Sequence, residues 1–286
     1  MTIKRMTAAL AALLLGVSLL HAEDRETKVI GYNILLGFNR AARIEVGAAY
    51  LRRENPDVVL FQEVARQNGE SFARQARMWN HSYAAVAKPW QDYSIGITSK
   101  RPFDMLEIRT DGMHHGYILA KIDGVYYMSI HYSPFSYKVR ITESEIYAKR
   151  LKPLIDAGER VIMMGDFNNP SPHDAVQANN NATALEIRRN EKDPKIENIR
   201  EGFFDFTCIN NLLNLGLVEI CYPWMWDNNY HPWVGVRIDM AFITPNLVPL
   251  VTRAFVDVRN REMLESISDH FPVILTLKNL DKENHQ

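Results

Sequence analysis

Short apolar runs recur along the chain, and their length is that of a buried strand. Turn-forming residues such as glycine, proline and asparagine bound these runs, which indicates strands that end abruptly. A continuous apolar run of this kind is typical of a strand covered on both faces of its sheet. The predicted strands are Thr27–Ile34, Val58–Phe61, Val125–Ile130, Val161–Met164, Met240–Ile243 and Val273–Leu277.

The strand at 161–164 leads directly into Gly165, Asp166, Phe167 and Asn168. Asp166 and Asn168 are two residues apart, so in extended backbone their side chains point the same way. Aspartate and asparagine are also ordinary turn formers, so this segment alone leaves a purely structural interpretation open. The other predicted strands favour a functional interpretation, because each of them also has a polar residue next to one of its ends.

Residues that can bind a metal or transfer a proton stand at one end of each other strand. They are Asn33, Glu63, His131, Asp239 and His270, in chain order. Open α/β sheets gather their sites at strand ends. Both ends of the chain contribute to this group, so the sequence favours a single domain that spans residues 23–286. A length of 286 residues could also hold two domains. The polar, helix-like stretch 179–200 is the best candidate for a surface insertion.

Six short segments carry these residues, and their order resembles that of the endonuclease/exonuclease/phosphatase family. These metal-dependent phosphoesterases include deoxyribonuclease-like nucleases, sphingomyelinases and inositol-phosphate phosphatases. The resemblance covers nearly the whole chain after residue 22, and it implies an α/β fold in which a two-sheet β-sandwich is flanked by helices, four layers as in deoxyribonuclease. The segments are Tyr32–Ile34, Gln62–Glu63, Ser129–His131, Gly165–Asn168, Arg237–Asp239 and Ser268–His270.

The resemblance also implies a metal site. Water must attack an anionic phosphoester, and a divalent cation withdraws charge from it; Mg²⁺ prefers one or two carboxylates together with water and substrate oxygens. We expect Mg²⁺, or Mn²⁺, bound by Glu63 with support from Asn33 and Asp269. A surface glutamate that merely follows a strand is the structural alternative for Glu63.

The catalytic roles follow from the same resemblance. Asp166 is expected to orient and deprotonate the attacking water, with Asn168 donating to a phosphate oxygen. His270 needs an orienting carboxylate, and Asp239 is the candidate for that partner. His131 is expected to be the second imidazole, which stabilises charge or protonates the leaving oxygen.

The match to the family is weakest at the acidic partner of His131. Several nucleases of the family pair this histidine with an acidic residue from the segment before the Gly96 strand, and Asp92 is the one that this sequence offers there. A lone histidine after a strand is otherwise more often structural. His114 and His115 receive no role, because they could form a surface turn.

An aromatic segment precedes Arg237. Three of the five tryptophans, Trp224, Trp226 and Trp233, lie there among proline, asparagine and aspartate, which is a loop composition. Aromatic faces beside a phosphate site could stack on a base, a sugar or an inositol ring, or enter a lipid interface. The alternative is that these rings fold down to cap the sandwich.

The first 22 residues have the form of a secretory signal: Lys4 and Arg5, then the apolar run Ala8–Leu20, then Ala22. We expect cleavage before Glu23 and a secreted or periplasmic protein, with an uncleaved anchor as the alternative. Cleavage would change the net charge from −1, with 33 basic and 34 acidic residues, to −3, with 31 and 34. This charge indicates no broad polyanion-binding surface, although a local basic cleft is compatible with it.

The chain has two cysteines, Cys208 and Cys221. In an oxidising compartment they could close a short loop that contributes about 3 kcal/mol. Two buried free thiols are the alternative.

The sequence therefore predicts a secreted, monomeric, divalent-metal-dependent phosphoester hydrolase, and among these a phosphodiesterase. Its substrate could be a nucleic acid, a phospholipid headgroup, or an inositol or sugar phosphate. A secreted nuclease is the alternative within this chemistry. An inactive binding module on the same fold is the alternative of another class, but such a module should have lost at least one candidate residue, and Glu63, Asp166, Asn168, Asp239 and His270 are all present.

Overall fold

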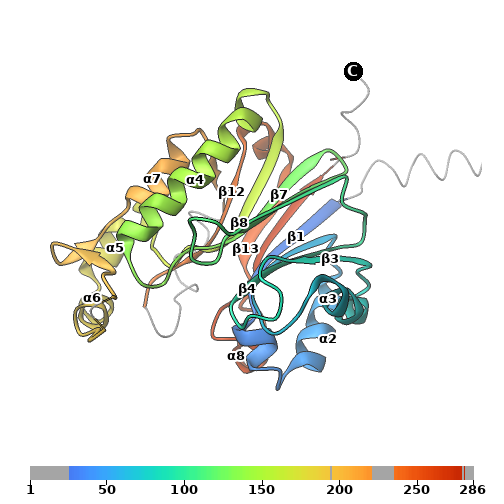
Figure 1. The fold of residues 1–286 in the computed structure, drawn as a ribbon, viewed down its shortest axis with the longest axis horizontal. Coiled ribbons are helices and arrows are strands. Elements are labelled where there is room, and N and C mark those ends of the chain that lie inside the picture. The colour runs from blue at the N-terminus through green and yellow to red at the C-terminus, as the bar shows by residue number, and fades with distance from the viewer. Residues whose placement is uncertain (1–25, 194, 221–234, 279, 281–286) are drawn as a thin grey trace, which may run out of the picture.

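The computed structural model describes residues 26–193, 195–220, 235–278 and 280, and within them two six-stranded sheets pack face to face (Figure 1). Neighbouring strands of the first sheet are, in order, β13 (Val251–Val256), β14 (Val273–Lys278), β1 (Glu26–Asn33), β2 (Val58–Val64), β4 (Ser94–Ser99) and β3 (Tyr83–Val86). Those of the second are β11 (Val218–Glu219), β12 (Asp239–Ile243), β8 (Arg160–Asp166), β7 (Val125–His131), β6 (Tyr117–Ile122) and β5 (Met105–Arg109). The predicted α/β sandwich is confirmed.

Helices cover the outer face of each sheet, which gives four layers (Figure 1). Beside the first sheet lie α2 (Ile44–Glu54), α3 (Gly69–Ala76) and α8 (Arg261–Ile267), with the short turns η1 (Leu35–Asn39) and η2 (Arg77–Trp79). Beside the second sheet lie α4 (Tyr137–Asp156) and α7 (Thr207–Leu213). Within the described part of the chain, no helix combines the length with the apolar character needed to cross a bilayer.

The main core lies between the two sheets and extends under α2 and α8. Its side chains come from both sheets, as Ile30 of β1 and Met164 of β8 illustrate, and both are fully buried. A Cβ atom at Gly31 would lie 3.1 Å from the Cβ of Met164, so the missing side chain lets the sheets approach closely there. A second cluster fills the space between the second sheet and α4 and α7.

Register within the second sheet places the candidate residues side by side. Strands β7 and β8 are parallel, and His131 lies opposite Asp166. Strands β12 and β8 are antiparallel, and Asp239 lies opposite Asp166 on the other side. Asp166 is therefore the central member of a row of three neighbouring strand positions.

The absence of a side chain at Gly165 lets strand β7 lie very close to strand β8. A Cβ atom at Gly165 would lie 2.0 Å from the carbonyl oxygen of Ile130, which is backbone and cannot move aside cheaply. We expect Gly165→Ala to lower the free energy of unfolding by about 1 to 3 kcal/mol or more, measured by denaturant titration. Gly69→Ala is the control, since its Cβ would meet nothing nearer than 3.6 Å. Equal stability of the two variants would contradict the packing argument.

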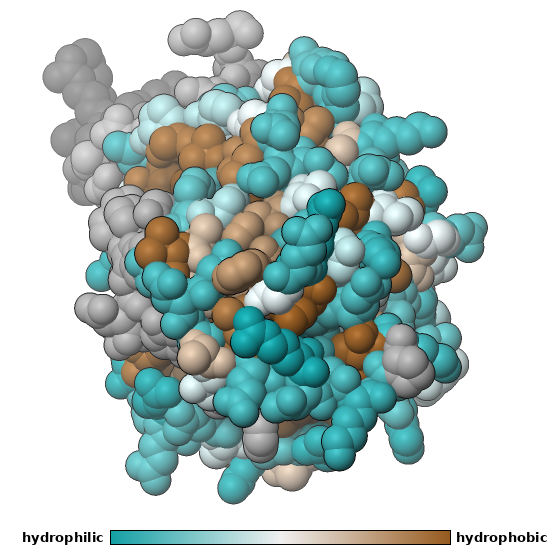
Figure 2. All heavy atoms as spheres, turned by 90° about the vertical axis from the view of Figure 1, so that its left-hand side faces the viewer, coloured by the Kyte–Doolittle hydropathy of each residue, from teal (hydrophilic) through white to brown (hydrophobic). Residues whose placement is uncertain are grey.

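The stretch 179–200, predicted as a surface insertion, contains the end of α5 (Ala175–Asn180), then α6 (Ala182–Arg189) and the strand β9 (Ile199–Arg200). The turn η3 (Pro172–Asp174) precedes α5, and β10 (Phe203–Phe204) pairs with β9 in a short hairpin. These elements extend from one end of the second sheet (Figure 1). The face on that side of the molecule is largely hydrophilic and interrupted by hydrophobic side chains (Figure 2). A further turn, η4 (Pro245–Leu250), joins β12 to β13.

Candidate active site

The ends of β1, β2, β7 and β8, the start of β12 and the segment before β14 meet at one rim of the sandwich. The buried carboxylate of Asp166 is at the centre of this group. Its Oδ2 accepts a hydrogen bond from Nδ2 of Asn33 at 3.2 Å, and it lies 3.4 Å from Nε2 of His131 and 3.7 Å from Nε2 of His270. Asn33 belongs to the first sheet and His131 to the second, so this carboxylate connects the two sheets.

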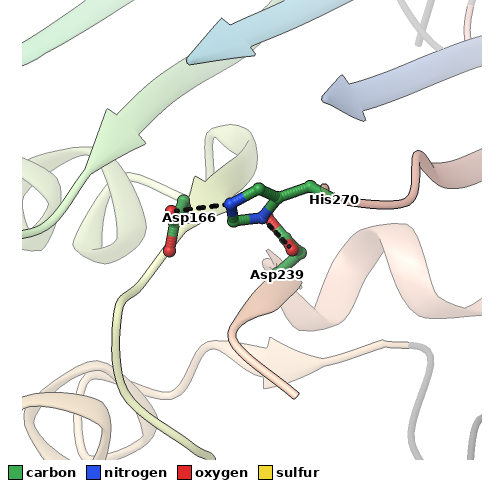
Figure 3. A group of neighbouring side chains, drawn as sticks. All are labelled: Asp166, Asp239 and His270. Atoms are coloured by element: carbon green, nitrogen blue, oxygen red, sulfur yellow. Dashed lines mark hydrogen bonds and ion pairs between the residues drawn. The ribbon is translucent and has the colours of Figure 1, made fainter. Parts of the chain in front are cut away.

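His270 lies between two carboxylates (Figure 3). Its Nδ1 is 2.8 Å from Oδ2 of Asp239, while its Nε2 faces Asp166. Burial alone would lower the pKa of His270, but the charge and hydrogen bond of Asp239, and then the charge of Asp166, raise it to about 10. The ring is therefore protonated at neutral pH, and the predicted pairing of His270 with Asp239 is present in the structure.

The two carboxylates that face His270 have pKa values shifted in opposite directions. Burial raises the pKa of Asp239 to about 6, against the opposing charge and hydrogen bond of His270. Burial acts in the same direction on Asp166, but the hydrogen bond from His131 and the charge of His270 overcome it and hold the pKa of Asp166 below its usual value. Both groups are ionised at pH 7, so Asp166 is able to accept a proton.

Ser268, the residue directly after α8, fixes the position of His270. The hydroxyl of Ser268 donates to the backbone carbonyl of Asn33 at 2.7 Å, and its oxygen accepts from the backbone N–H of His270 at 3.1 Å. This serine thus ties the segment before β14 to the end of β1. Asp269 lies at the same rim, with Oδ1 3.9 Å from Nε2 of His270.

Glu63 comes from an irregular end of β2. The pairing of β2 with β4 shifts register between Phe61 and Val64, which is the mark of a β-bulge, and Glu63 has a positive φ of 60°. Such strain in a non-glycine residue is characteristic of functional sites. The carboxylate of Glu63 accepts from Nδ2 of Asn33 at 3.2 Å and from the backbone N–H of Leu36 at 3.1 Å.

Asn168 also has a positive φ, 47°. Its backbone N–H donates to Oδ1 of Asp166 at 2.8 Å, and its side-chain Nδ2 donates to the carbonyl oxygen of Tyr132 at 3.0 Å. An amide Nδ2 has two hydrogens, so Asn168 retains a second donor. The side chain of Asn168 is therefore held in place beside the candidate base.

The charge of this group fits a divalent cation. Ligand atoms of Asp166, Asp239 and His270 lie within 4.8 Å of one another, a spacing at which such an ion could be held. Glu63, Asp166 and Asp239 contribute three carboxylates against the two imidazoles of His131 and His270, so the cluster keeps negative charge even with both rings protonated. Hard oxygen ligands with residual negative charge are the donors that Mg²⁺ and Mn²⁺ prefer.

His131 has a different neighbour from the one that the sequence indicated. Asp92 forms an exposed ion pair with Nε of Arg66 at 2.8 Å, and within the described residues Nδ1 of His131 has no hydrogen-bond partner. Instead, the ring of His115 stacks on His131 with centroids 3.9 Å apart and planes 7° from parallel. The assignment of Asp92 as the partner of His131 is therefore wrong.

His115 is the residue of this site that sequence reasoning missed. It is buried, and burial first, followed by the charges of His131 and His114, holds its pKa below the usual value. A neutral ring stacked on His131 restricts the plane in which that imidazole can lie. The adjacent histidines 114 and 115 were the available signal, but a histidine pair is more often a surface turn.

Trp224, Trp226, Trp233 and Cys221 lie outside the described residues, so their predicted roles stay predictions. Cys208 is buried in α7, and burial raises the pKa of its thiol to about 12.

The fold and the site define a phosphoesterase-type sandwich with a buried Asp, Asp and His group. Residues 31–270 match the model of the Endonuclease/Exonuclease/phosphatase family, and the chain belongs to that family. No functionally curated protein matches the sequence.

Solved structures agree with this fold. An AP endonuclease from Archaeoglobus fulgidus superposes with a TM-score of 0.64 at 17% identity, over 88% of this chain and 99% of that one. A 3′-5′ exonuclease from Neisseria meningitidis superposes with a TM-score of 0.62 at 17% identity, over 87% and 98%. A 3′ phosphatase from Neisseria, bound to a product DNA hairpin, gives a TM-score of 0.61 at 17% identity, over 87% and 98%. At 17% identity these similarities support a shared fold and not a shared activity.

Proposed function

We propose that this protein is an exported, divalent-metal-dependent phosphodiesterase. Membership of the family supports phosphoester hydrolysis as the general class of reaction. The observation that carries the finer proposal is the position of the His270 ring between Asp239 and Asp166, at the same rim as Glu63 and Asn33. Export rests on the signal-like residues 1–22 of the sequence.

Glu63 is the proposed metal ligand, with Asn33 and Asp269 in support. The carboxylate of Glu63 receives neutral donors, an amide and a backbone N–H, so its charge is not cancelled by them. Both ring nitrogens of His270 face carboxylates, and a protonated imidazole has no lone pair for a metal. We therefore favour Glu63 over the Asp166, Asp239 and His270 group. When bound, Mg²⁺ or Mn²⁺ withdraws charge from a phosphate oxygen.

Asp166 is the proposed general base. It is ionised, it is held by Asn33 and the backbone N–H of Asn168, and it accepts the proton of a water aimed at phosphorus. His270 donates from Nε2 to a phosphate oxygen as charge develops, and Asp239 keeps the ring protonated and oriented. Asn168 donates its free amide hydrogen to the phosphate. His131 supplies the second imidazole, next to the leaving oxygen.

A comparison of a diester with a monoester tests this proposal. The protein without residues 1–22 is incubated in Mg²⁺ with bis(4-nitrophenyl) phosphate and, separately, with 4-nitrophenyl phosphate. We expect faster release of nitrophenolate from the diester, because the three carboxylates of Glu63, Asp166 and Asp239 repel a doubly charged monoester more strongly than a singly charged diester. Preference for the monoester would contradict the phosphodiesterase assignment, and release from neither would contradict hydrolase activity on simple esters.

A further inference from the structure

A hollow of about 680 Å³ lies beside the candidate active site. Four of the side chains that line it carry rings: Trp90, Tyr93, His114 and His115. His115 connects this hollow to the reacting groups, because its ring lines the hollow and also stacks on His131. A ligand in the hollow is thus one side chain away from the proposed catalytic imidazole.

Trp90 and Tyr93 expose large aromatic surfaces at this hollow. The two side chains are 63% and 53% exposed, and Trp90 has a left-handed φ of 67°. Exposed tryptophan in a strained backbone conformation costs free energy, so it indicates a binding role more than a packing role. Both belong to the segment between β3 and β4.

Backbone hydrogen bonds hold this segment in place. The N–H of Trp90 donates to the carbonyl of Gln67 at 2.9 Å, and the N–H of Arg66 donates to the carbonyl of Gln91 at 3.0 Å. Nδ1 of His115 donates to the carbonyl of Tyr93 at 3.1 Å. The aromatic rings therefore project from a fixed frame, which lowers the entropy cost of binding a ligand against them.

Charge at the hollow is positive near the rings. The ammonium of Lys88 donates to the carbonyl of His114, which places it on the lining. Arg66 also lines the hollow, and Asp92 neutralises it in part through an exposed ion pair. One ammonium next to aromatic faces can receive a phosphate while a planar ring stacks beside it.

The lining favours one of three ligand classes over the others: a sugar or inositol phosphate, a phospholipid, or a nucleic acid. Sugars and inositols need many carboxylates and amides to bond their hydroxyls, and here the carboxylate of Asp92 is engaged by Arg66, which leaves Gln91 as the amide. An acyl chain needs an apolar lining, and this one is mostly charged and polar. Four rings with an ammonium suit a nucleobase and its neighbouring phosphate better than either.

We propose that the hollow formed by Lys88, Trp90, Tyr93 and His115 binds one nucleotide of a single-stranded nucleic acid next to the bond that is cut. This inference rests on the proposed phosphodiesterase function and names its substrate class. The small net charge of the chain is consistent with it, because a subsite of this kind relies on stacking more than on a broad basic surface.

Binding of a fluorescein-labelled hexathymidylate tests the hollow independently of hydrolysis. All measurements use an Asp166→Asn background in Mg²⁺, and fluorescence anisotropy gives the Kd. We expect Trp90→Ala and Tyr93→Ala each to weaken binding about tenfold, because stacking on one base contributes about 1 to 3 kcal/mol. Lys88→Ala is expected to reduce the salt dependence of log Kd by about 0.7 per decade, the value for one phosphate contact of a single strand.

Tyr83→Ala is the matched control, because Tyr83 is also an exposed tyrosine, 40% exposed, at the other end of β3. Its Kd should equal that of the background protein. Unchanged Kd in both Trp90→Ala and Tyr93→Ala would overturn the proposal. So would loss of binding to phosphatidylcholine and phosphatidylserine vesicles in Trp90→Ala with oligonucleotide affinity intact, since the rings would then be a membrane contact.

Hydrolysis of bis(4-nitrophenyl) phosphate separates this inference from the proposed function. With Asp166 restored, Tyr83→Ala should keep kcat/KM on this small ester within about twofold, because Tyr83 belongs neither to the hollow nor to the candidate active site. If the unaltered protein does not cleave the ester, the proposed function fails while the anisotropy result still decides the hollow. If it cleaves the ester but Trp90→Ala and Tyr93→Ala bind hexathymidylate normally, only the present inference fails.

Discussion

Replacing Asp166 with asparagine is expected to lower phosphodiester turnover by about a hundredfold or more. The amide keeps the size of the side chain and its contact with Asn33, but it cannot accept a proton from water. His270→Ala should have an effect of the same order, because it removes the protonated donor that Asp239 holds at 2.8 Å. Since both groups act mainly in the transition state, KM should change much less than kcat. Initial rates on bis(4-nitrophenyl) phosphate give both constants.

Asp156→Asn is the control for this pair of variants, because Asp156 is exposed on α4 and pairs with Lys152. It should retain the turnover of the unaltered protein. Thermal unfolding of each variant establishes that it is folded. A folded Asp166→Asn or His270→Ala protein with near-normal turnover would refute the assigned roles.

The strand ends at the site were predictable from the sequence because they obey local rules. A buried strand is a continuous apolar run. The polar residue at the end of such a run lies at the rim of the sheet, whichever strands lie next to it. Asp166, Asp239 and His270 each follow or precede such a run, and the ordered motifs placed them in one cleft. Their contacts in the structure agree with that placement.

The partner of His131 was not predictable in the same way. Contact between His115 and His131 depends on the path of the segment between β5 and β6, which tertiary packing decides. Asp92 is near in sequence to the position where the family has an acid, yet the ion pair with Arg66 takes its side chain elsewhere. Charge complementarity across a loop leaves no local pattern in the sequence.

The backbone around Glu63 was also beyond sequence reasoning. Residues of η1, including Leu36 and Phe38, have positive φ values of 54° and 64°, although neither residue favours that conformation. In this turn Gly37 and Asn39 are the residues whose types favour left-handed backbone. The turn brings the N–H of Leu36 to the carboxylate of Glu63 at 3.1 Å, so the strain serves to hold the proposed metal ligand.

Removal of divalent cations is expected to abolish hydrolysis. The side chains at the rim carry more carboxylates than imidazoles, so the protein alone supplies too little positive charge to stabilise a phosphoryl transition state. Activity on bis(4-nitrophenyl) phosphate should fall below detection in excess EDTA, and it should return when Mg²⁺ or Mn²⁺ is added in excess of the chelator. Full activity in the presence of the chelator would exclude the proposed mechanism.

Glu63→Gln identifies the ligand in this experiment. The amide keeps the shape of the side chain but removes its charge, so the variant should need at least about tenfold more Mg²⁺ for half-maximal activity. A second readout does not depend on turnover: Mg²⁺ should raise the melting temperature of the unaltered protein, because a ligand that binds the folded state stabilises it, and it should raise that of Glu63→Gln much less. Glu70→Gln is the control, since Glu70 is exposed on α3 and pairs with Arg74. If Glu63→Gln and Glu70→Gln respond to Mg²⁺ alike, the ion is held by other residues, and the group of Asp166, Asp239 and His270 becomes the site to test.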